Sequence, residues 1–129
     1  MVSLQEKAPK TGALLRMCNM RLYHKDVYMP EFSLEDFWRG VEKLIPTRHY
    51  LERQVSKNIP LPTIELVRGG EIFEVGIEFD EVLKVCYRVH TPTVDYCYVI
   101  RKGGVVVTAW TQHPDDLHST LDRSKYWTD

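Results

Sequence analysis

The chain has 129 residues, of which 43% are hydrophobic and 27% are charged, and its formal net charge is −1 at pH 7. This size and composition are typical of one globular domain with a single core, so we expect one domain over residues 1–129. The near-neutral charge argues against a general nucleic-acid coat protein, which carries a basic excess, but it does not exclude a local basic pocket.

Cysteine usage and the absence of a long apolar run indicate the compartment. The three cysteines, Cys18, Cys86 and Cys97, are odd in number and irregularly spaced, so they do not indicate a disulfide framework. The sequence has no run of roughly 18 apolar residues, which a membrane span requires. Residues 1–10 lack the apolar centre of a signal peptide. We expect a cytoplasmic protein with no membrane partner.

The N-terminal third is expected to be an arm followed by a helix. Residues 1 to about 12 are polar and include Pro9 and Gly12, so we expect residues 1–20 to form a flexible or loosely packed arm. Residues 21–29 are ambiguous between a short strand and an extended segment. Ser33, with an acidic residue three positions later, forms a variant of the capping box. The apolar residues that follow recur at helical spacing, which predicts a helix over 33–44 that ends before Pro46.

A second helix is expected directly after Pro46. Thr47 is a suitable N-cap residue, and the helix it begins extends to about residue 58. The side of this helix that is expected to be buried carries three residues, Tyr50, Leu51 and Val55. Pro60 and Pro62 then force the chain into an extended conformation.

From residue 63 the hydrophobic period changes to two, which is typical of strands. Residues 72–79 predict a strand whose apolar side chains alternate with glutamates on a solvent-exposed face, and a second strand follows over 85–90. Gly103-Gly104 predicts a two-residue hairpin turn. A tight turn there places Tyr98 opposite Ala109, Val99 opposite Thr108, and Cys97 beside Trp110.

Pro114, followed by two aspartates, predicts a short C-terminal helix. The expected fold class is therefore α+β, with N-terminal helices packed on a twisted antiparallel sheet of about four strands and a short C-terminal helix. His113 and these aspartates match no established metal-ligand spacing. We expect no metal site and no cofactor.

The second predicted helix carries the first candidate site. His49 and Arg53 lie one helical turn apart and share a face, with Ser56 and Lys57 close by. Arg48, beside them, is a candidate for substrate binding. Cleavage of an RNA phosphodiester needs an acid/base group and cations, and histidine and arginine supply both. The alternative is a solvated helix face on which Glu52 pairs with Arg48, and the position of His49 and Arg53 roughly opposite Leu51 favours that alternative.

The predicted C-terminal hairpin carries the second candidate site. Arg101 and Lys102 would neutralise phosphate, Thr108 adds a hydroxyl, and Trp110 or Tyr98 would stack on a base. The alternative is that these are ordinary strand residues beside a solvated turn. The two candidate sites support each other only if the sheet face bearing Thr108 turns toward the second helix.

Five short segments also carry a family resemblance. They are Thr-Arg-His-Tyr-Leu-Glu-Arg at 47–53, Ile-Pro-Leu-Pro-Thr-Ile-Glu-Leu at 59–66, Gly-Gly-Glu-Ile-Phe at 69–73, Tyr-Val-Ile at 98–100 and Val-Val-Thr-Ala-Trp at 106–110. The pattern spans residues 47–112 and resembles the small RelE/barnase-like toxin superfamily, nearest to its uncharacterised domains from toxin–antitoxin pairs and mobile elements. The resemblance implies RNA cleavage without metal, with His49 and Arg53 as the helix-borne catalytic pair and Thr108 as their strand-borne partner.

Two functions of different classes follow. The first is a metal-independent endoribonuclease-like toxin domain that acts on RNA, accompanied by an antitoxin or immunity protein. The second is a non-catalytic phage or mobile-element protein that binds and inhibits a host protein, since tyrosine, tryptophan and arginine are favoured interface residues. A weaker third hypothesis is a small-ligand binder with a cavity between helix and sheet.

Overall fold

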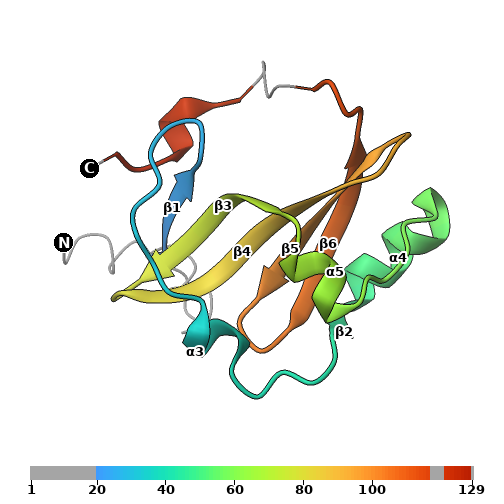
Figure 1. Cartoon of the computed structure of the whole chain (residues 1–129), viewed down its shortest axis with the longest axis horizontal. Helices are drawn as coiled ribbons and strands as arrows, with labels where there is room; N and C mark the ends of the chain where they lie inside the picture. The colour runs from blue at the N-terminus through green and yellow to red at the C-terminus, as the bar shows by residue number, and fades with distance from the viewer. Residues whose placement is uncertain (1–19, 117–120, 129) are drawn as a thin grey trace, which may run out of the picture.

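The computed structural model describes residues 20–116 and 121–128, so residues 1–19 of the predicted arm lie outside it. Its centre is a six-stranded mixed sheet in the order β1-β3-β4-β5-β6-β2 (Figure 1). The strands are β1 (Arg21–His24), β2 (Ile45–Pro46), β3 (Glu71–Glu78), β4 (Glu81–His90), β5 (Asp95–Arg101) and β6 (Val105–Gln112). Neighbouring strands are antiparallel, except that β2 runs parallel to β6.

The helices are short compared with the sheet. They are α3 (Glu35–Trp38), α4 (Arg48–Lys57), α5 (Ile64–Arg68) and the 3-10 helix η1 (Arg123–Lys125). The predicted fold of N-terminal helices on a four-stranded antiparallel sheet is therefore wrong, because the sheet has six strands, is mixed and dominates the described residues. Among those residues, no helix has the length and apolar character needed to cross a membrane.

The predicted helix over 33–44 forms only as the single turn α3. Its backbone becomes extended at Arg39 and adopts a left-handed conformation at Gly40, where φ is 74°. The chain then turns into β2, which pairs with β6. Phe37 and Trp38 are buried, and the Trp38 indole nitrogen donates a hydrogen bond to the Tyr87 hydroxyl at 3.0 Å. The apolar spacing therefore identified buried residues, but not their backbone conformation.

The helix α4 begins where its cap predicts, but its buried side differs from the prediction. The Thr47 side chain accepts a hydrogen bond from the Tyr50 backbone nitrogen, as an N-cap residue does. Tyr50 is fully buried and donates its hydroxyl to the Ile59 carbonyl. Leu51 and Val55 are 46% and 89% exposed, so their predicted burial is wrong. The helix turns its Tyr50 side inward, which leaves the opposite side in solvent.

The three predicted pairs of the last hairpin are confirmed, but its turn spans residues 102–104 instead of the two predicted glycines, and a register shift between Val99 and Ile100 compensates for the extra residue. Tyr98 pairs with Ala109, Val99 with Thr108 and Cys97 with Trp110. Because side chains alternate across a sheet, this register divides it into two faces. Tyr98 and Ala109 belong to the main core beneath the helices, which we call the first face, whereas Cys97, Val99 and Trp110 form a smaller cluster on the second face.

The strand β3 departs from simple alternation. A register irregularity between Ile72 and Glu74 places Phe73 in the second-face cluster, and Glu74 and Glu78 are both buried. The predicted solvent-exposed glutamate face is therefore wrong. Phe79, which was expected to point inward, is 90% exposed because it lies in the turn after β3 with a φ of 51°.

Candidate functional site

The helix α4 lies along the outer edge of β6. The short strand β2 pairs only with Val105 and Val106, so the rest of this edge needs another partner. The Thr47 hydroxyl donates to the Val107 carbonyl at 2.7 Å, and the Arg53 Nε donates to the Ala109 carbonyl at 2.9 Å. These two bonds bracket Thr108, so α4 covers the edge carbonyls on both sides of it.

The side chains of α4 point in different directions around the helix axis, from the first face of the sheet toward the outer edge of β6. At 3.6 residues per turn, Arg53 and His49 lie about 60° and about 100° from Tyr50, both in the same sense. Tyr50 is in the main core and Arg53 binds the strand edge, so this progression directs His49 toward the second face. His49 is exposed, and Thr108 is partly exposed on the second face.

Arg53 is held by only part of its guanidinium group. Its Nε binds the Ala109 carbonyl, and among the described residues its two terminal amino nitrogens have no hydrogen-bond partner. Within the same part of the chain, His49 has no side-chain partner. Arg48, by contrast, lies 3.5 Å from Glu52 in an exposed ion pair, as the alternative interpretation expected. The site therefore presents one anchored guanidinium and one open imidazole.

The hairpin residues separate into two groups. Arg101, Thr108 and Trp110 follow one another on the second face, and Arg101 is exposed. Lys102 forms an ion pair with Glu81 at the turn. Tyr98 is fully buried on the first face and donates its hydroxyl to the Pro60 carbonyl at 2.8 Å, so its ring is not available to stack on a base.

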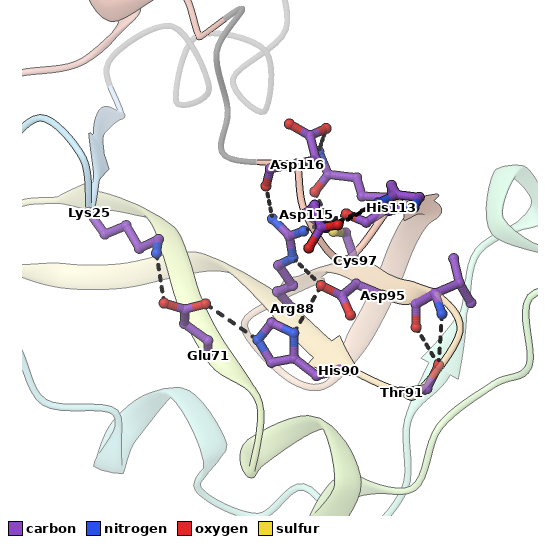
Figure 2. Close-up of polar contacts among 12 residues, drawn as sticks. Lys25, Glu71, Arg88, His90, Thr91, Asp95, Cys97, His113, Asp115 and Asp116 are labelled. Atoms are coloured by element: carbon purple, nitrogen blue, oxygen red, sulfur yellow. Dashed lines mark hydrogen bonds and ion pairs between the residues drawn. The ribbon is translucent and has the colours of Figure 1, made fainter.

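A second group of polar residues links β3, β4 and β5, and sequence reasoning missed it. Figure 2 shows a continuous chain of contacts from Lys25 through Glu71, His90 and Asp95 to Arg88. The Lys25 Nζ lies 2.7 Å from Glu71, and the two nitrogens of the His90 ring lie 3.6 Å from Glu71 and 2.9 Å from Asp95. The Arg88 Nε lies 2.7 Å from the same Asp95 oxygen.

Arg88 joins this network to the segment that follows β6. Its terminal nitrogens donate to the backbone carbonyls of His113 and Asp116 at 3.1 and 3.2 Å. Burial alone would raise the pKa of Asp95, but the Arg88 hydrogen bond and the charge of His90 outweigh burial and hold this pKa below its ordinary value. A weak sequence signal existed, because Arg88 and His90 alternate with apolar residues in β4 and the register places Asp95 on the same face.

The cavities that flank these elements differ in their lining. One of about 440 Å³ lies beside Arg88 and His90, and its lysine and arginine side chains are matched by the acidic residues Asp26, Glu71 and Asp116. Another of about 610 Å³ lies near α3 and has an acidic lining that does not suit phosphate. A hollow of about 340 Å³ on the second face contains Trp110.

Neither polar group resembles a metal centre. In residues 20–116 and 121–128, no three histidine, cysteine, aspartate or glutamate side chains gather as metal ligands would. The predicted C-terminal helix corresponds to a turn after His113 and to η1, with residues 117–120 outside the described residues. No protein-family model, curated protein or solved structure matches this chain.

Proposed function

We propose that the chain cleaves RNA phosphodiesters without a metal ion, at the edge of the sheet where α4 lies against β6. The supporting observation is the pair of bonds from Thr47 and Arg53 to the carbonyls on either side of Thr108. These bonds hold α4, which carries the His49 imidazole and the Arg53 guanidinium, against the strand that carries the Thr108 hydroxyl. The three groups are those that the resemblance to RelE/barnase-like toxins assigns to catalysis.

The chemistry assigns one role to each side chain. His49 takes the proton of the ribose 2′-hydroxyl, whose oxygen attacks the adjacent phosphorus. The bond from phosphorus to the 5′-oxygen breaks, and that oxygen takes a proton from water. The products are a 2′,3′-cyclic phosphate and a 5′-hydroxyl. Because the 2′-oxygen is the nucleophile, the reaction requires RNA and does not proceed on DNA.

The cations stabilise the charge that develops on phosphorus. Arg53 is positioned by its Nε bond, which leaves both terminal amino groups to bind two phosphate oxygens as a fork. Thr108 donates its hydroxyl to the same phosphate from the second face. Arg101 lies further along that face and would bind a neighbouring phosphate of the strand.

Cleavage of a defined RNA by the purified chain in EDTA tests this proposal. We expect fragments ending in a cyclic phosphate, no cleavage of the same sequence as DNA, and a loss of about 10²- to 10⁴-fold in rate for His49→Ala at an unchanged melting temperature. His113→Ala is the matched control, because His113 is also exposed but lies beyond β6. Intact RNA, or equal cleavage by wild type and His49→Ala, would contradict the proposal.

A second candidate, a non-catalytic protein that binds and inhibits a host protein, rests on the outward side of α4. Leu51 and Val55 lie one turn apart there and are 46% and 89% exposed, as interface residues would be before binding. If RNA stays intact, a pull-down with wild type and Val55→Glu tests this candidate. A partner retained by wild type and lost by the variant would support it.

A further inference from the structure

The second face of the sheet carries an aromatic hollow that the proposed catalytic groups do not fill. Its volume is about 340 Å³, and its lining includes Phe73 from β3, Trp110 from β6 and Tyr126 after η1. The ring centroids of Phe73 and Trp110 lie 6.2 Å apart in an edge-to-face arrangement. Aromatic side chains arranged around an open space are the usual platform for an unstacked nucleobase.

The polar groups of the hollow are held in place and consist mostly of acceptors. Glu74 is buried and accepts from the Tyr126 hydroxyl and the Lys84 Nζ, both at 2.7 Å. The Gln112 amide nitrogen donates to Asp116 at 3.0 Å, and its carbonyl oxygen accepts from the Cys97 thiol at 3.1 Å, which leaves that oxygen one lone pair for a ligand. These carboxylate and amide oxygens suit a ligand edge that offers N–H donors.

The position of the hollow relative to the proposed site is set by β6. Trp110 and Thr108 are two residues apart on the same face, which separates them by about 7 Å along the strand. One ribose spans such a separation. A phosphate held at Thr108 therefore brings the base of an adjoining nucleotide to Trp110.

We propose that this hollow binds the nucleobase next to the cleaved phosphate and prefers bases with an exocyclic amino group. Adenine, cytosine and guanine each offer an amino group to the acceptors around Glu74 and Gln112, whereas uracil offers a single ring N–H. The inference rests on the proposed RNA cleavage, because it places the base beside that site. It adds a base preference that the catalytic groups alone do not predict.

The test measures binding of the four nucleoside 5′-monophosphates to the His49→Ala chain by calorimetry across the millimolar range. We expect AMP, GMP and CMP to bind more tightly than UMP. Trp110→Ala, added to that chain, should weaken them by about ten-fold or more, the effect of one lost base–aromatic stack. Trp127→Ala is the matched control, because Trp127 is 48% exposed and packs beneath Arg21 instead of in the hollow.

The outcomes separate this proposal from the cleavage proposal. Equal binding of all four nucleotides, no binding, or the same affinities in Trp110→Ala would overturn the base site, even if wild type cleaves RNA. Selective binding that Trp110→Ala weakens would support the base site, even if RNA stays intact and the cleavage proposal fails. If Trp110→Ala does not fold, Gln112→Leu tests the same wall of the hollow, and we expect it to reduce the preference over UMP.

Discussion

Arg53 and Arg88 place the same guanidinium group in two contrasting environments. Arg88 is 4% exposed, and its Nε and both terminal nitrogens bind Asp95 and two backbone carbonyls (Figure 2). Arg53 is half-buried and, within residues 20–116 and 121–128, forms its hydrogen bond through Nε, to the carbonyl of Ala109. The first arrangement ties chain segments together, whereas the second holds an arginine in place while leaving its fork open to a ligand.

The histidines of the two regions repeat the contrast. The ring of His90 lies between two carboxylates, those of Asp95 and Glu71. The ring of His49 has no partner among the described residues and projects from α4 into solvent. The Arg88 region has more charged groups, but each of them pairs with a neighbouring charged group. The α4–β6 edge has fewer, and among the described residues His49 and the terminal nitrogens of Arg53 have no partner, which supports the proposed function.

The largest expected effect is the loss of stability when the ion pair of Arg88 with Asp95 is removed. Asp95→Ala leaves the Arg88 charge buried without its carboxylate, which should lower the free energy of unfolding by about 3–5 kcal/mol. Urea denaturation measures this loss. Asp115→Ala removes an exposed carboxylate nearby and should cost little. A cost below about 1 kcal/mol for Asp95→Ala would contradict a structural role for this ion pair.

Acid sharpens the comparison, because it titrates the paired carboxylates. Burial would raise the pKa of Glu74, but the charge and hydrogen bond of Lys84 lower it, and the pKa of Asp95 is also lowered. In the unfolded chain the pKa values of Glu74 and Asp95 are 4.5 and 3.8, and in the folded protein both are lower. As the pH falls, the unfolded state therefore binds protons before the folded state does. Stability should therefore be full above these values and fall below them.

For each carboxylate, the free energy of unfolding falls by at most about 1.4 kcal/mol per pH unit as the pH is lowered. Denaturation curves recorded from about pH 6 to about pH 3 measure the combined slope. Asp95→Asn removes one titrating group and should make the dependence shallower. A free energy of unfolding that stays constant or rises on acidification would contradict this prediction.

The smallest expected effect concerns the N-caps of α4 and α5. Thr47→Ala and Thr63→Ala each remove a capping hydroxyl and should each cost about 1 kcal/mol in denaturation experiments. Thr47 also donates to the Val107 carbonyl, so only its loss should loosen α4 on β6 and reduce RNA cleavage. Equal cleavage by the two variants at matched folded fractions would remove the proposed link between this bond and activity.

Local chemistry predicted some of these elements well. The Thr47 cap and the pairing of Val99 with Thr108 were both readable, because a cap and a hairpin involve residues close in sequence. The predicted helix over 33–44 is wrong because the backbone leaves the helical conformation at Arg39 and Gly40, and β2 pairs with the edge of β6, a partner about 60 residues away. Spacing alone does not reveal a long-range partner.

The same division applies to the candidate site. The sequence by itself determined the residue types, the spacing of His49 and Arg53 on one helix, and the side of β6 that Thr108 shares with Trp110. Only the tertiary structure decided that α4 lies on the β6 edge, that Tyr98 is buried, and that Arg88 and Asp95 neutralise each other. These outcomes depend on contacts between distant segments, whose energies favour burial and hydrogen-bond satisfaction over local preference.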